Sequence, residues 1–185
     1  RGAPESIADG QYERTRKEWE QFTWQQGASE AARWQQALRD AGLKEGDRIA
    51  VWMRNCGDWV AIDQAALGLG LAVVPLYLDD RPDSVAYILG DAGARLLVVQ
   101  DAGIWRKLAP ALDKANTQLN CVVVRGERDK AGPTLHDKEC WSSDWLPPSG
   151  GELADYRGDP HALASIVYTS GTTGKPKGVM LSHSN

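Results

Sequence analysis

Apolar residues recur along most of this chain with two different periods. In four segments they stand three or four positions apart, which is the period of an amphipathic helix. Between these segments lie short, continuous apolar runs of the kind that form strands buried on both faces. The segments that predict helices are 29–41, 58–70, 81–91 and 104–115, and the runs that predict strands are 48–53, 72–76, 96–99, 121–124 and 163–168.

Turn and cap residues set the expected ends of the helices. Gly42 follows the first helical pattern and is expected to stop it. Asp58 is expected to cap the second helix, and Pro82 fits the first turn of the third. Pro110 is expected to interrupt the fourth helix, because proline has no N–H and its ring clashes with the preceding turn.

Strands that alternate with helices of about 10–15 residues indicate right-handed βαβ units. The sequence therefore predicts an α/β fold, with a parallel sheet of about five strands and helices on both faces. The expected organisation is an arm or short helix leading into the domain (1–28), a βαβ-type subdomain (29–125), a long surface connection anchored by Trp141 and Trp145 (126–160), and a last strand followed by a glycine-rich loop (161–185).

Composition and charge exclude several classes of protein. The 185 residues are 42% hydrophobic and 25% charged, which is ordinary for a globular domain. A net charge of -4 argues against a surface that tracks nucleic-acid phosphates. No apolar run reaches the length of a membrane span, and the polar, charged amino end is unlike a signal peptide. We therefore expect a cytoplasmic protein that does not bind nucleic acid.

Three cysteines, Cys56, Cys121 and Cys140, are odd in number and widely spaced, which favours buried free thiols in a reducing compartment. His136, Asp137 and Glu139 stand close to Cys140 in sequence. This group lacks a second ligand pair at metal-site spacing, so we interpret it as a solvated turn and expect no metal ligand in this chain.

The loop after the last apolar run carries the candidate chemistry. Its glycines let backbone N–H groups turn toward an anion, its hydroxyls can donate to phosphate oxygens, and its lysines add positive charge. It follows a strand, at the edge where ligands bind in open α/β sheets. The loop therefore predicts a polyphosphate site, with the candidate ligand-binding residues Thr169, Ser170, Gly171, Thr172, Thr173, Gly174, Lys175 and Lys177.

Other phosphate and nucleophile motifs do not fit this loop. A Walker loop needs Ser or Thr after Gly-Lys, where Pro176 stands here. A nucleophile elbow needs glycine two residues before the serine, and Tyr168 occupies that place before Ser170. A flexible surface loop remains the alternative to the predicted polyphosphate site. If the loop does bind an anion, a non-catalytic nucleotide- or anion-binding module remains the alternative to an enzyme.

The whole segment Tyr168–Val179 resembles the signature loop of the adenylate-forming superfamily, which includes acyl-CoA synthetases, peptide-synthetase adenylation domains and luciferases. Weaker markers follow in the order that the family shows them, and those from Asn55 onward are most similar to the long-chain fatty acid–CoA ligases. These markers are Phe22–Trp24, Gly46–Ala50, Asn55 with Trp59, Val74–Tyr77, and Ala86–Leu89 with Asp91 and Gly93.

The resemblance implies a two-step reaction. A carboxylate, in the first place a fatty acid, attacks the α-phosphate of Mg-ATP, and CoA then takes the acyl group from the acyl-adenylate. Thr169–Lys177 would hold the β- and γ-phosphates, and no catalytic nucleophile lies in this segment. Aryl, medium-chain or amino acids, and a carrier protein in place of CoA, are the alternatives.

The resemblance also implies that the Mg²⁺-binding glutamate, the ribose-binding aspartate and the small carboxyl-terminal domain lie beyond Asn185. We therefore expect residues 1–185 alone to be inactive and to self-associate through uncovered apolar surface. Trp19, Trp24 and Trp34 raise the further alternative of weak peripheral membrane contact.

Overall fold

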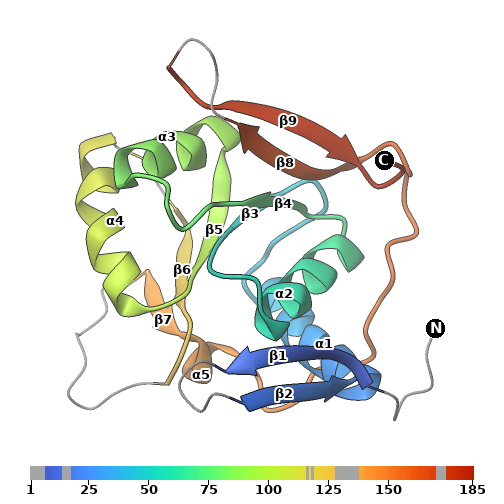
Figure 1. Cartoon of the computed structure of the whole chain (residues 1–185). Helices are drawn as coiled ribbons and strands as arrows, with labels where there is room; N and C mark the ends of the chain where they lie inside the picture. The colour runs from blue at the N-terminus through green and yellow to red at the C-terminus, as the bar shows by residue number, and fades with distance from the viewer. Residues whose placement is uncertain (1–6, 14–17, 116, 118, 128–137, 170–173) are drawn as a thin grey trace.

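A seven-stranded sheet forms the centre of the molecule, and helices cover both of its faces (Figure 1). The computed structural model describes the backbone of residues 7–13, 18–115, 117, 119–127, 138–169 and 174–185. Of these residues, it describes the side chains from residue 21 onward. The strand order is β7-β6-β5-β3-β4-β8-β9, and all neighbours are parallel except the antiparallel pair β8–β9. The strands are β3 (Arg48–Trp52), β4 (Ala72–Pro75), β5 (Ala94–Val99), β6 (Cys121–Val124), β7 (Glu139–Trp141), β8 (Leu163–Thr169) and β9 (Lys177–Ser182).

Alternate residues of the central strands enter two separate cores. Ile49 and Val51 of β3 pack under the helices α1 (Trp24–Asp40) and α2 (Gly57–Gly68). Ala50 and Trp52 pack on the opposite face, under α3 (Pro82–Ala92) and α4 (Ala102–Ala115). The period of two along a strand places successive side chains on opposite faces, so a continuous apolar run fills both cores. The predicted α/β fold with helices on both faces is confirmed.

The amino-terminal residues form a hairpin and not a short helix, which was one of the two interpretations of this segment beside an entry arm. β1 (Ile7–Glu13) and β2 (Glu18–Thr23) pair antiparallel as a separate two-stranded sheet. Thr23 then caps α1: its hydroxyl accepts from the Gln26 N–H at 3.2 Å, and its own N–H donates to Gln26 Oε1 at 2.8 Å. This reciprocal capping starts the helix at Trp24, before the apolar period begins. The first turn shows no apolar period because its residues are exposed.

Two expected local features are also different in the structure. The N-cap of α2 is Cys56, and Asp58 lies inside the first turn, where its carboxylate pairs with Arg125. α4 continues through Pro110 without interruption, so the break expected there is absent. The cap of α4 comes from Asp101, whose carboxylate accepts the Ile104 N–H at 2.9 Å.

The segment 126–160 carries more regular structure than expected, because β7 extends the sheet beyond β6 and is followed by the single-turn helix α5 (Ser142–Trp145). Both expected anchors are confirmed. Trp141 is buried, and the Trp145 ring lies 5.6 Å from the Trp34 ring. Among the described residues, no helix is long and apolar enough to cross a membrane.

Candidate functional site

The candidate phosphate loop connects β8 to β9, so it is the turn of an antiparallel hairpin. Thr169 and Lys177 are cross-strand partners at its base, and Gly174 and Lys175 lie on its return arm. All four are exposed. The remaining candidate residues, 170–173, lie outside the described residues. The structure therefore brings together the base of the loop and both of its lysines at an open, solvent-accessible edge.

At two positions of this hairpin, the structure explains why the residue is glycine. Gly174 has a φ of 85°, a left-handed conformation that costs other residues energy. At Gly178, an added β-carbon would lie 2.7 Å from Ile166 Cγ2 and 3.1 Å from Tyr168 Cζ. Glycine at this position lets the Tyr168 ring lie across β9. In the sequence, both glycines were recognised only as part of the motif. The structure shows that Gly174 is required by its backbone conformation and Gly178 by the lack of space for a side chain.

Tyr168 fastens the end of β8 to helix α3. Its hydroxyl donates to Asp91 Oδ2 at 2.6 Å, and Tyr87 donates to the other carboxylate oxygen at 3.4 Å. Burial, and then the hydrogen bond to Asp91, raise the pKa of Tyr168 well above its ordinary value. The hydroxyl therefore stays protonated and acts as a donor, which gives Tyr168 a positional role and not that of a base.

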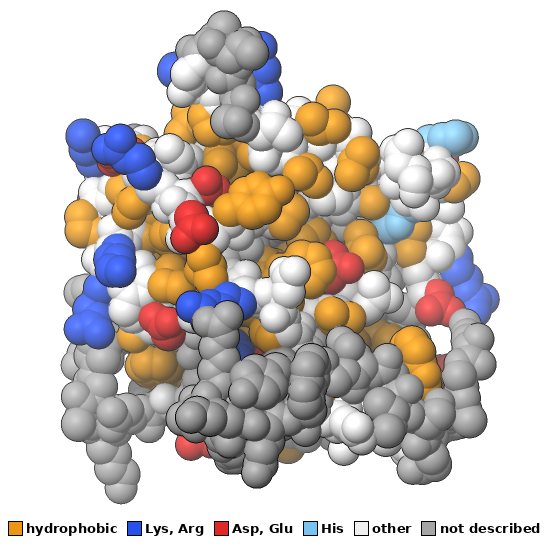
Figure 2. Space-filling model, viewed as in Figure 1, with side chains coloured by type: hydrophobic (Ala, Val, Ile, Leu, Met, Phe, Trp, Pro, Cys, Tyr) orange, Lys and Arg blue, Asp and Glu red, His pale blue; other side chains and the backbone are white. Residues whose placement is uncertain are grey.

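Lys175 lies over an aromatic ring of the same helix. Its Nζ is 5.5 Å from the centre of the Tyr87 ring, within the range of a cation–π interaction. Figure 2 shows Lys or Arg side chains at the top of the molecule, with hydrophobic and acidic side chains just below them. In the same view, Figure 1 places α3 and the β8–β9 hairpin there. Tyr87 and Asp91 were not predicted as site residues. Their spacing of four on one helix was the available signal.

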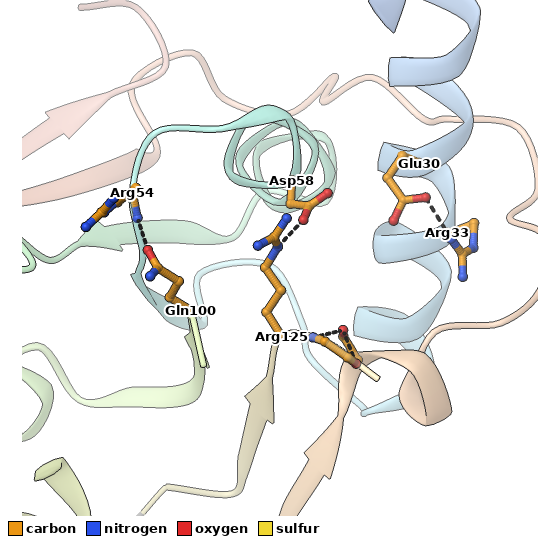
Figure 3. A network of polar contacts seen from close by, with 8 residues as sticks. Glu30, Arg33, Arg54, Asp58, Gln100 and Arg125 are labelled. Atoms are coloured by element: carbon orange, nitrogen blue, oxygen red, sulfur yellow. Dashed lines mark hydrogen bonds and ion pairs between the residues drawn. The ribbon is translucent and has the colours of Figure 1, made fainter. Parts of the chain in front are cut away.

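A second polar group lies at the carboxyl ends of the central strands (Figure 3). Just after β3, the Arg54 N–H donates to Gln100 Oε1 at 3.1 Å, which ties the ends of β3 and β5 together. Arg125, just after β6, pairs with Asp58 of α2. These bonds join strand ends and a helix to one another, and we interpret them as structural contacts.

The cysteines and histidines that the structure describes form no further candidate site. All three thiols are free and half-buried, so they are less buried than the sequence indicated. Cys121 Sγ and Cys140 Sγ lie 3.8 Å apart, and their hydrogen bond raises the pKa of Cys140. His183, in the turn after β9, stacks on the Tyr156 ring at 4.2 Å. Among the described residues, no group of three or more His, Cys, Asp or Glu is placed to hold a metal.

Comparison with known proteins identifies the family of the chain. The family of AMP-binding enzymes matches residues 5–185, which is nearly the whole chain and includes the loop. The chain belongs to this family. The predicted resemblance to acyl-CoA synthetases, long-chain ones among them, is confirmed.

Relatives of this AMP-binding chain differ in the acid that their names mention. The fatty acyl-CoA synthetase A of Dictyostelium discoideum is 28% identical over 100% of this chain. The acetyl-coenzyme A synthetase of Rhodopirellula baltica is 29% identical over 95%. The chain spans 27% of the length of each. The anthranilate CoA ligase AuaEII, solved with anthranoyl-AMP, has a TM-score of 0.77 and 27% identity over 89% of this chain and 30% of its own.

Proposed function

We propose that the protein containing these 185 residues is an ATP-dependent fatty acid–CoA ligase of the cytoplasm. It joins a carboxylate to the α-phosphate of ATP, which releases pyrophosphate, and then transfers the acyl group to the thiol of CoA. The observation that supports this most is the Tyr168–Gly178 loop, which is set at the open β8–β9 edge of an AMP-binding fold with Lys175 and Lys177 exposed.

In this proposal the loop acts on the departing pyrophosphate. Backbone N–H groups and hydroxyls from Thr169 to Thr173 donate to the β- and γ-phosphate oxygens, and Lys175 and Lys177 balance their charge. Donors fixed in place before the reaction stabilise the charge that develops on a leaving group at little cost in reorganisation. They also hold the α-phosphate in line with the attacking carboxylate. No covalent intermediate with the protein is involved.

Mg²⁺ accompanies ATP in this proposal, and the residues described at the loop do not fit it as protein ligands. Hydroxyls and lysines dominate there, whereas Mg²⁺ prefers carboxylate and water oxygens. The nearby carboxylate of Asp91 already accepts two tyrosine hydroxyls. The resemblance to the adenylate-forming family implies a metal-binding glutamate beyond Asn185, so we assign no step to a metal held by this segment.

A fatty acid is the proposed substrate because the markers around Tyr77 and Asp91 resemble the long-chain branch. An acetyl-coenzyme A synthetase and an anthranilate CoA ligase are also similar to this chain. Acetate and aromatic acids are therefore the competing substrates to test.

The decisive experiment measures pyrophosphate release from ATP by the full-length protein. Acetate, a medium-chain acid, a long-chain acid and an aromatic acid are compared, and the long-chain acid is expected to give the highest kcat/KM. Thioester formation from preformed acyl-adenylate and CoA is followed separately. A full-length protein that binds ATP but releases no pyrophosphate with any acid would favour the non-catalytic binding module instead.

Lys175→Ala and Thr172→Ala test the role of the loop. Each should slow adenylation by about 30- to 1000-fold, which corresponds to about 2–4 kcal/mol for one lost donor at a developing charge. Thioester formation from acyl-adenylate should be nearly unchanged, because pyrophosphate has left before that step. Lys107→Ala, which removes an exposed charge from α4, is the control. Equal losses in both half-reactions would contradict the proposed role.

A further inference from the structure

We propose that Tyr87 and Asp91 of α3 are positioning residues for the phosphate loop. Asp91 fixes the end of β8 through the Tyr168 hydroxyl, and the Tyr87 ring holds the Lys175 ammonium on the return arm of the loop. The inference rests on the proposed function and extends it, because it assigns the orientation of the loop to a helix that is distant in sequence.

Helix α3 can serve as a rigid base because it is held firmly in the fold. One face of it is buried in the core, including Val85 and Leu89, which are both 0% exposed. Its carboxyl end is fixed as well: Gly93 adopts a left-handed conformation, and Arg48 donates to the carbonyl oxygens of Ala92 and Gly93, each at 2.8 Å. Groups on its outer face are therefore held in place relative to the sheet.

Tyr87 and Asp91 share that outer face, since residues four apart on a helix are neighbours. One carboxylate oxygen of Asp91 accepts the Tyr168 hydroxyl, and the other accepts the Tyr87 hydroxyl. A hydrogen bond to a charged acceptor is stronger than one between neutral groups. The carboxylate thus couples the last buried residue of β8 to the ring that holds Lys175.

The chemical nature of the partner of Lys175 explains why this arrangement suits a phosphate site. A carboxylate in place of the ring would neutralise the ammonium and would have to be displaced by ATP. The neutral face of Tyr87 restricts where the ammonium lies and leaves its charge available to a polyphosphate. A ligand that finds its partner group already oriented gains affinity, because less conformational freedom is lost on binding.

The test uses the full-length protein and ATP in the pyrophosphate-release assay. Tyr87→Leu should lower kcat/KM for ATP about two- to fivefold, the range that corresponds to an exposed cation–π contact. Tyr87→Phe keeps the ring and should retain most of the activity. Thioester formation from acyl-adenylate should not change in either variant. Asp83→Asn, which removes a carboxylate from the first turn of the same helix, is the control.

A double-mutant cycle separates positioning from a general structural effect. In a Lys175→Met background, Tyr87→Leu should have no further effect on kcat/KM, because the group that it positions is gone. If Tyr87→Leu proves unstable, Tyr87→Met serves as the ring-less variant of similar volume. Equal effects with and without Lys175, or an equal loss with Phe, would overturn the inference. A wild-type protein that releases no pyrophosphate with any acid would instead contradict the proposed function.

Discussion

The centre of the sheet and its β8–β9 edge contain similar apolar residues but are buried to very different degrees. Ile49 and Leu97, in β3 and β5, are 0% exposed, whereas Met180 in β9 is 73% exposed. The central strands have a strand on each side and helices on both faces. β9 is an edge strand, and β8 is its neighbour in the sheet. The burial of an apolar run thus depends on what surrounds it, and not on its composition alone.

The two regions are also held by different interactions. Apolar packing under two helix layers stabilises the centre. The loop end of the hairpin depends on the Tyr168–Asp91 hydrogen bond and on the contact between Lys175 and Tyr87. A rigid, dry centre therefore supports a lightly held edge that carries the candidate ligand groups.

The largest expected difference between the two regions is in core truncation. Leu97→Ala should lower the free energy of unfolding by about 2–5 kcal/mol, because it leaves a cavity among residues that cannot fill it. Met180→Ala should change it by less than about 0.5 kcal/mol, because this side chain is exposed. Urea unfolding of both variants, followed by circular dichroism, measures the two values. Similar losses at the two positions would contradict the contrast.

A smaller effect is expected at the anchor between the regions. Tyr168→Phe should lower the free energy of unfolding by about 0.5–1.5 kcal/mol at neutral pH, because Asp91 is exposed and can bind water instead. The folded-state pKa of Tyr168 is raised above its ordinary value of 10.0, so its contribution is complete below that pH and is lost as the pH rises further. Denaturant unfolding between pH 7 and pH 11 should show the two proteins converging, and a constant difference would contradict the assignment.

The exposed edge should also affect the association of the chain with itself. Unpaired backbone groups and exposed apolar side chains on β9 favour pairing with a second chain. We expect the 185-residue chain to self-associate, and Met180→Lys to weaken this association. Light scattering across a concentration series measures it, with Val60→Lys, an exposed apolar position on α2, as the control. A strictly monomeric wild-type chain at high concentration would contradict this prediction.

The smallest expected effect lies at the helix layer of the central region. Burial raises the pKa of Asp63 on α2, and the hydrogen bond from Gln64 offsets this only in part. The charged carboxylate therefore costs stability as the pH rises above its ordinary pKa of 3.8. Asp63→Asn should raise Tm slightly at pH 7 and leave it unchanged below pH 3.8. A variant with a lower Tm at pH 7 would show that Asp63 has a stabilising partner.

The helices and strands that the sequence predicted correctly are those with a clear local period of apolar residues. Residues 49–53 and 96–99 form continuous apolar runs because both faces of their strands are buried, and this pattern is visible without a structure. The amino-terminal hairpin was missed because β1 and β2 form a separate two-stranded sheet, and their residues show no sustained alternation. The strand β7 has three residues, too few for any period to appear.

The loop sequence by itself indicated the family, through its resemblance to the signature loop, and its glycines, hydroxyls and lysines indicated the candidate phosphate-binding residues. Only the tertiary structure showed that α3 contacts this loop and the strand before it. Tyr87 and Asp91 are separated from Tyr168 and Lys175 by more than seventy residues, and a contact over that distance leaves no trace in local periodicity. The candidate chemistry of the loop is visible in adjacent residues of the sequence. Its contacts with α3 arise only when this helix, remote in sequence, packs against the sheet.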